Sequence, residues 1–262
     1  MDLDLSITYY QQLLGLGLIA IRPAAVFLVM PAFSPQTIPA MVRNSIFLAL
    51  GLAAVAVNPQ PGPPAGLVPN AAFFLKEIFI GLSIGLFFSI FLYALETAGQ
   101  VIDNATGRSF ASVIDPLGGH NSSLTGTFFA RFANFIFMFS GGFMLMTGVL
   151  MESYALWPLA APFPDLEAGG VTLFEGEYQR LMTVALAFAA PALCIIFAVD
   201  LSLGLVNRFA PQLNVFALSL SIKAWLSTLA VIIVLGVAVD GVIADMIERK
   251  GLVTDLMRLL AR

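Results

Sequence analysis

The chain has 262 residues, of which 59% are apolar and 11% are charged. An ordinary soluble domain carries about 25% charged residues, so this composition excludes one, and the 23 Phe exclude a disordered chain or a coiled coil. A net charge of −4 without a basic cluster excludes nucleic acid as a partner. The lipid bilayer is the solvent that remains.

Six long apolar runs follow one another along the chain. A helix needs about 20 mostly apolar residues to cross about 30 Å of hydrocarbon. The runs cover residues 7–30, 41–57, 71–99, 127–151, 180–206 and 213–239. No Lys or Arg precedes the first run as in a signal peptide, so we expect that run to stay in the mature protein. The sequence therefore predicts an all-α, multi-pass membrane protein with about six long hydrophobic helices in hairpins, forming a single domain over 1–262.

The connections between the runs differ in length. The prolines of 58–70 forbid a helix there, so this stretch is expected to be a loop. Only residues 207–212 separate the last two runs, and so short a connection predicts that these runs form a tight antiparallel hairpin. Beyond them, 240–262 alternates apolar and charged residues at helical spacing, which predicts an amphipathic helix, interrupted near Gly251, on a membrane or a partner. Its basic residues favour a cytoplasmic carboxyl end.

Several charged residues fall within the apolar runs. An isolated charge at mid-bilayer costs about 2.5 to 3.5 kcal/mol, so these side chains must lie near an interface or face protein or water. For Arg22, snorkelling to an interface and burial within protein are both open. The charged residues are Arg22, Lys76, Glu77, Glu96, Arg131, Asp200 and Lys223.

Asp200 and Lys223 form the most concrete expected pair. They lie 10 and 13 residues from Ala210 in the short turn, which corresponds to roughly 15 and 20 Å along the two helices. A salt bridge within the hairpin is therefore expected, either as a purely structural pair or with a role in conduction or gating. Gly81 and Gly85 allow close helix approach, and the glycines at 141 and 142 are expected to break the fourth run. Cys194, in an apolar run, is expected to be buried.

The stretch 100–126 (QVIDNATGRSFASVIDPLGGHNSSLTG) is polar and rich in glycine. Between two apolar spans it is either a re-entrant or pore-lining element, whose amides need protein or water, or a solvated surface loop. The single histidine, His120, has no nucleophile elbow beside it, and the chain carries no Walker loop, paired-His zinc spacing or dinucleotide fingerprint. We therefore expect no enzyme, no cofactor and no metal site.

Four blocks of sequence, spread over most of the chain, carry a family resemblance. They are LSLGLVNRFAPQLNVF at 201–216, PAFSPQTIPAMVR at 31–43, AGQVIDNATGRSFASVIDP at 98–116 and ESYALWP at 152–158. Together they resemble the FliR/SctT family, the T component of the type III secretion export apparatus and its flagellar counterpart. The ESYALWP block and Lys223 resemble the injectisome branch more than the flagellar one.

The resemblance implies a one-copy subunit of an export gate in the bacterial inner membrane. Its expected partners are the R and S subunits, counterparts of FliP and FliQ, the U switch protein, membrane lipid, and unfolded secreted proteins as cargo. The helices are expected to wind into a helical assembly partly extruded from the membrane. In the family, the segment after the third apolar run is a channel plug, which here falls on Thr106, Gly107, Arg108, Ser109, Phe110, Asp115, Pro116, Gly118, Gly119 and His120.

Further polar positions match the family's hairpin motif or the block at 31–43, and we expect them at interfaces or helix ends: Arg208, Gln212, Asn214 and Arg43. We expect the ionised positions as a group to be sheltered by sister subunits around a shared conduit. Two other hypotheses stay open: a self-contained small-solute or ion transporter, and a purely structural assembly subunit in which 100–126 is only a loop.

Overall fold

The computed structural model describes residues 17–35, 37–57, 67–108, 123–159, 161 and 168–260. Within these ranges the chain is helical and contains no strand. An unlabelled first helix, Gly17–Val29, is followed by η1 Pro31–Phe33, α2 Ala40–Val57, α3 Leu67–Thr106, α5 Leu124–Phe139, α6 Gly142–Leu156, α7 Ala168–Phe209 and α8 Val215–Leu260. The all-α prediction is confirmed.

The helices group into two compact units. Unit 1 comprises residues 1–90, 138–177 and 246–262, and unit 2 comprises 91–137 and 178–245. The prediction of a single domain over 1–262 stays a prediction. The units are described separately below.

In unit 1 the helix Gly17–Val29 crosses α3 at two glycines. A Cβ on Gly81 would collide with the carbonyl oxygen of Arg22, and a Cβ on Gly85 would lie 2.8 Å from the carbonyl oxygen of Val26. The predicted close approach at this GxxxG pair is therefore confirmed, with an internal helix as its partner. Phe27 at the end of the first helix stacks on Phe33 of η1, with ring centroids 4.0 Å apart.

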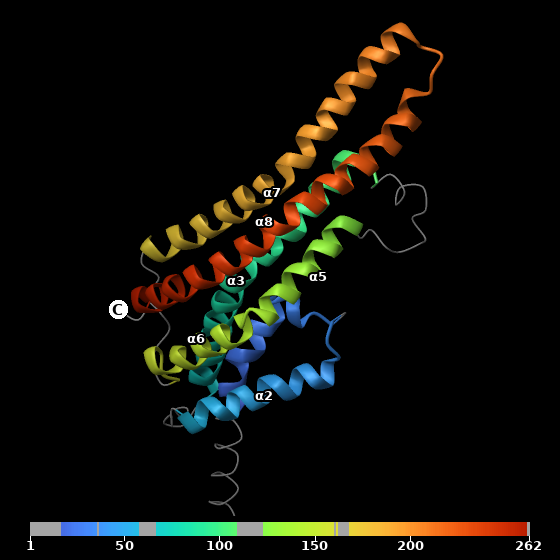
Figure 1. The fold of residues 1–262 in the computed structure, drawn as a ribbon. Helices are drawn as coiled ribbons and strands as arrows, with labels where there is room; N and C mark the ends of the chain where they lie inside the picture. The colour runs from blue at the N-terminus through green and yellow to red at the C-terminus, as the bar shows by residue number, and fades with distance from the viewer. Residues whose placement is uncertain are drawn as a thin grey trace, which may run out of the picture. The chain divides into compact units, whose positions relative to one another are not determined.

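In unit 2 the two longest helices run side by side as an antiparallel pair, joined by a short turn (Figure 1). The turn begins after Phe209 and ends before Val215, close to the position predicted from 207–212. Phe91 of α3 meets Phe188 of α7 edge to face at 6.0 Å. Both rings face Gly241 of α8, where a Cβ would lie 3.0 Å from Phe91. This aromatic contact fixes α3 against the hairpin.

Within the described residues, the number of membrane-length helices differs from the predicted six. Among the described residues three helices are long and apolar enough to cross a bilayer, Ala71–Thr106, Val171–Phe209 and Val215–Glu248. A fourth span results only if α5 and α6 count as one broken span. The described part of the first apolar run forms the helix Gly17–Val29, since residues 7–16 lie outside the described residues, and the second run lies in α2. These two helices pack on each other in unit 1, because a Cβ on Gly51 of α2 would lie 3.1 Å from the Cα of Ala20.

Other expected boundaries also shift. The prolines of 58–70 do not exclude helix throughout, because α3 already begins at Leu67. The tail is not a separate helix: α8 is continuous to Leu260 and passes through Gly251, where a helical glycine costs only about 1 kcal/mol. The break at Gly141 is confirmed, with a left-handed φ of 82°. Cys194 is exposed, contrary to expectation.

Candidate functional site: a polar clasp at the ends of segment 109–122

The helix α3 ends immediately before segment 109–122, in a turn that requires glycine. Gly107 has a φ of 82°, which only glycine adopts without strain. Its amide donates to the carbonyl of Asn104 at 3.2 Å, and the amide of Arg108 donates to the carbonyl of Asp103 at 3.1 Å. This pair of bonds is the Schellman motif that closes helix C-termini. The expected polar stretch is thus helical up to Thr106, and the chain turns sharply there.

The helix α5 begins immediately after the same segment and is capped from two directions. Ser123 accepts a hydrogen bond from the amide of Gly126 at its Oγ, 2.8 Å away. Asp103, on the last turn of α3, accepts one from the amide of Thr125 at 2.8 Å. A carboxylate at a helix N-terminus is favourable because the first amides carry partial positive charge. The chain on the two sides of segment 109–122, at the end of α3 and the start of α5, is therefore joined by hydrogen bonds.

Asp103 is the centre of this arrangement, since both of its oxygens are occupied. Oδ1 accepts from Thr125 Oγ1 at 2.6 Å and from Arg108 Nη1 at 3.1 Å. Oδ2 accepts from Ser123 Oγ at 2.6 Å in addition to the Thr125 amide. The residue is 1% exposed, so these bonds replace its hydration.

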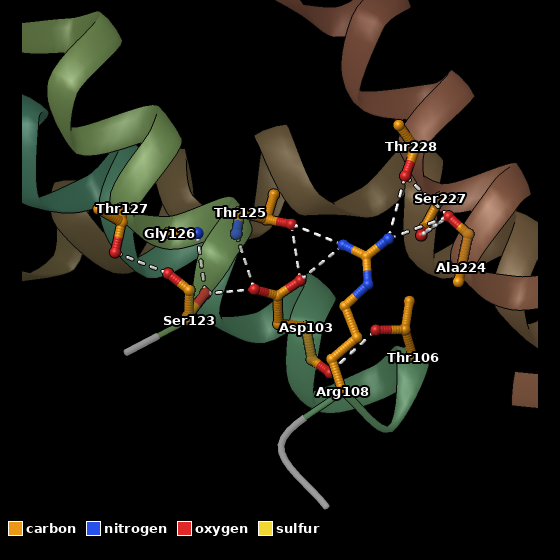
Figure 2. A network of polar contacts seen from close by, with 10 residues as sticks. All are labelled: Asp103, Thr106, Arg108, Ser123, Thr125, Gly126, Thr127, Ala224, Ser227 and Thr228. Atoms are coloured by element: carbon orange, nitrogen blue, oxygen red, sulfur yellow. Dashed lines mark hydrogen bonds and ion pairs between the residues drawn. The ribbon is translucent and has the colours of Figure 1, made fainter. Parts of the chain in front are cut away.

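Arg108 extends the network to a third helix. Its Nη1 also donates to Thr125 Oγ1 at 3.0 Å, while Nη2 donates to the carbonyl of Ala224 at 3.1 Å and to Thr228 Oγ1 at 3.0 Å. Figure 2 shows the guanidinium of Arg108 between the carboxylate of Asp103 and the side chain of Thr228 on α8. We call Asp103, Arg108, Ser123, Thr125 and Thr228 the clasp. It ties the end of α3, the start of α5 and the middle of α8 together.

Close backbone contact between α3 and α5 reinforces the clasp one turn before Asp103 on α3. A Cβ on Gly99 would lie 2.5 Å from both the Cα and the amide nitrogen of Gly126. A Cβ on Gly126 would lie 2.8 Å from Ser123 Oγ, the capping atom. Only glycine at both positions lets α3 and α5 approach closely enough for Asp103 to reach the α5 amides.

We predict that Gly99→Ala destabilises the protein by about 1 to 3 kcal/mol, because backbone atoms cannot yield to the added methyl group. Gly148→Ala on α6 is the matched control, since a Cβ there meets nothing within 4 Å. A helical glycine gains up to about 1 kcal/mol on replacement by alanine, so the control should be neutral or stabilising. Unfolding midpoints in detergent measure both; equal midpoints for the two variants would contradict the close approach.

A cavity of about 260 Å³ lies beside the clasp within unit 2. Arg108 and Thr228 form its polar side, and Phe128 of α5 with Val231, Ile232 and Leu235 of α8 form its apolar wall. The donors and acceptors of the clasp join α3, α5 and α8, so the clasp holds together residues 108 and 123, which flank segment 109–122.

The predicted plug residues divide between the described and the remaining parts of the chain. Thr106, Gly107 and Arg108 are described, and all three belong to the α3 terminus, where Thr106 Oγ1 donates to the carbonyl of Asp103 at 2.9 Å. The other plug residues lie outside the described residues: Ser109, Phe110, Asp115, Pro116, Gly118, Gly119 and His120. The three described residues therefore stand directly before segment 109–122.

A second polar cluster lies in unit 1 around Arg22. The guanidinium forms a bidentate pair with Glu77 of α3, with Nε to Oε2 at 2.8 Å and Nη2 to Oε1 at 3.0 Å. It also donates to Ser153 Oγ of α6 at 2.8 Å and to the carbonyl of Trp157 at 3.0 Å. The ring of Tyr154 lies 4.1 Å from the guanidinium carbon. Both Arg22 and Glu77 are fully buried.

Lys76 completes this cluster from the neighbouring position of α3. Its Nζ donates to the carbonyls of Pro158, Leu159 and Ala161 at 3.0, 2.7 and 3.1 Å, and lies 3.3 Å from Glu77 Oε1. These carbonyls follow the end of α6, whose dipole places partial negative charge there. Two buried cations and one carboxylate are thus balanced by helix-end carbonyls.

The burial of Arg22 excludes the snorkelling alternative in this structure. It also corrects the expectation that sister subunits shelter the ionised positions as a group: Arg22, Lys76 and Glu77 are matched inside the chain. Glu96 is half-buried and accepts from Gln100 Nε2 at 3.3 Å, and Arg43 donates to the carbonyl of Phe33 at 3.2 Å. Arg131 is exposed on α5.

The hairpin positions follow the predicted pattern in part. Lys223 Nζ lies 2.6 Å from Asp200 Oδ1, which confirms the predicted salt bridge. Asn214 caps α8, because its Oδ1 accepts from the amide of Ala217 at 3.3 Å. Arg208 and Gln212 are exposed at the tip, and their role at an interface stays a prediction.

The sequence did not predict the hydrogen-bond partners of Asp103, Arg108 and Arg22. Ser123 stands three residues before Gly126 at the start of an apolar run, which is an N-cap signal that was available. Nothing in the sequence places Thr228 beside Arg108 or Ser153 beside Arg22, because those contacts join positions more than 100 residues apart in the chain.

The chain matches the family model described as "Bacterial export proteins, family 1" over residues 13–248. It is 34% identical to "Yop proteins translocation protein T" of Yersinia pestis, over 84% of this chain and 85% of that protein. It is 31% identical to "Surface presentation of antigens protein SpaR" of Salmonella typhimurium, over 81% and 79%. It is 30% identical to "Flagellar biosynthetic protein FliR" of Bacillus subtilis, over 84% and 85%.

Proposed function

This chain belongs to the family of bacterial export proteins that includes FliR and the T components of type III secretion, and from that premise we propose how it works in the export apparatus. It is a membrane-embedded subunit of the export gate that forms part of a conduit for unfolded proteins. Segment 109–122 obstructs this conduit while the gate is closed, and the clasp anchors the segment at both ends.

The observation that carries the proposal is the joining of both ends of the segment through one carboxylate. Asp103 binds Arg108 on the near side of the segment and Ser123 and Thr125 on the far side. A solvated surface loop needs no such anchor. A segment that obstructs a conduit must resist displacement by polypeptide or ions. It therefore needs an anchor at its ends, since an unanchored loop would be displaced by small forces.

The finer assignments rest on the family. We place the protein in the bacterial inner membrane with the R and S subunits and the U switch protein, and we assign it no catalytic step. The injectisome branch is favoured by the ESYALWP block and by 34% identity to the Yersinia translocation protein, against 30% to the Bacillus flagellar protein.

Co-purification tests the assembly part of this proposal. The full chain, tagged and expressed with the R, S and U subunits of its own system, is expected to elute in one complex with R and S, and to accumulate less when they are absent. Liposomes that contain this chain alone should not take up small solutes or ions. Uptake by the lone chain, with no complex formed, would favour a self-contained transporter instead.

A further inference from the structure

The two members of the hairpin ion pair differ sharply in exposure. The side chain of Asp200 is 48% exposed, whereas that of Lys223 is 12% exposed. The side chain of Lys223 is therefore largely shielded, while that of Asp200 lies at the surface of the hairpin. The outward face of the pair is electrically negative.

Within the described ranges, neither member has its full set of hydrogen bonds. The ion pair between Lys223 Nζ and Asp200 Oδ1 is the single polar contact that either side chain makes there. An ammonium has three donors and a carboxylate about four acceptor sites, so most of this capacity is unused. In water the solvent would fill it, but α7 and α8 are both long and apolar enough to span a membrane. Hydrocarbon offers neither donor nor acceptor.

A row of exposed residues runs along the side of α7 that carries Asp200. Phe197, Asp200, Gly204 and Asn207 follow at intervals of three and four residues and are all exposed, so they share one side of α7. A Cβ on Gly204 would meet nothing within 4 Å, which leaves room for a close backbone. Asn207 adds a second hydrogen-bonding side chain, for which the described residues provide no partner.

We propose that this row of residues binds an apolar helix of another export-gate subunit, and that this helix carries a Lys or Arg side chain facing Asp200. The proposal rests on the proposed function, since it assigns chemistry to one of the expected subunit contacts. The sign follows from the exposure: the outward carboxylate attracts a cation and repels an anion. A bare lipid chain would leave a half-exposed carboxylate in hydrocarbon at a cost of about 2.5 kcal/mol or more.

Reversing the pair separates this interface role from an internal one. The double variant Asp200→Lys with Lys223→Asp keeps an ion pair within the hairpin but turns the outward charge positive. Its unfolding midpoint as an isolated chain should stay close to that of the wild type. In the complex, the amount of the partner that co-purifies should fall at least about tenfold, because like charges then face each other. Asp200→Glu is the matched control and should retain the partner.

Photo-crosslinking identifies the occupant in the assembled complex. A benzophenone amino acid at Gly204 should crosslink to a subunit whose apolar helix contains Lys or Arg, and the same label at Ser202, on another side of α7, should do so much less. Crosslinks to lipid alone, to a second copy of this chain, or equally from both positions would overturn the proposal. So would normal assembly of the reversed pair, which would leave the gate function standing. Failure of the wild-type chain to form any complex would instead count against the proposed function itself.

Discussion

Replacing Glu77 by Ala is expected to destabilise the protein by about 3 to 5 kcal/mol, because it leaves two buried cations without their carboxylate. Arg22 and Lys76 lie within 2.8 and 3.3 Å of Glu77, and all three are buried. Unfolding of the full chain in mixed detergent micelles measures the change. Glu152→Ala, at an exposed position on α6, is the matched control and should change the free energy of unfolding by less than about 0.5 kcal/mol.

A double variant separates the charge balance from simple loss of packing. Arg22→Met with Glu77→Leu removes the bidentate pair and replaces it by apolar side chains of similar volume. Because the double replacement leaves only Lys76 as a buried cation without a carboxylate, whereas the loss of Glu77 alone leaves two, the double variant should lose less stability than the sum of the two single changes. Additive losses, or a Glu77→Ala variant as stable as the control, would show that the cluster is not electrostatically coupled.

Asp103→Ala is expected to have the second large effect, because it opens the clasp. The change removes four hydrogen bonds, takes away the carboxylate that pairs with Arg108, and leaves the amide of Thr125 without its acceptor. A loss of about 3 kcal/mol in the free energy of unfolding follows from these lost contacts. In the assembled gate the loosened segment should also increase passive ion leakage.

Asp240→Ala on α8 is the control for this change, since Asp240 is exposed and lies outside the clasp. Arg108→Lys tests the contact between the clasp and α8. A lysine cannot bind Asp103 and Thr228 at the same time as the guanidinium does, so ion leakage should rise, with a smaller loss in the free energy of unfolding than in Asp103→Ala. An Asp103→Ala complex that is stable and as tight to ions as the control would contradict the anchoring role.

The sequence predicted contacts that depend on distance along one hairpin. The pair of Asp200 and Lys223 follows from counting residues back from a short turn, because both helices rise by the same amount per residue. The packing glycines Gly81 and Gly85 were found for a similar reason, since their spacing along one helix defines a face. In each case local geometry alone decides the outcome.

Contacts between distant segments were beyond this reasoning. Glu77 was recognised as a buried charge, but its bidentate partner Arg22 lies 55 positions away, and only the crossing at Gly81 brings them together. The clasp likewise needed the end of α3, the start of α5 and the middle of α8 to converge. A stretch that looked like one polar loop proved to include two helix ends, because helix backbones bond internally whatever the polarity of their side chains.

Hydropathy predicted six spans, whereas the described residues contain three, or four if α5 and α6 count as one broken span. Composition alone cannot report where a helix stops. Pro31 begins a short 3₁₀ turn, and Ala40 starts a new helix after it. The continuous α8 shows the opposite error, since polar residues after Asp240 did not end the helix.

Ion conductance of the assembled export complex in a planar bilayer tests the gate assignment most directly. The matched variant replaces segment 109–122 with a Gly-Ser linker of equal length and leaves the clasp residues in place. The wild-type complex should be closed to small ions, and the linker complex, with the same subunits in the same proportions, should conduct continuously. A linker complex that assembles fully and stays closed would contradict the assignment of this segment as the plug.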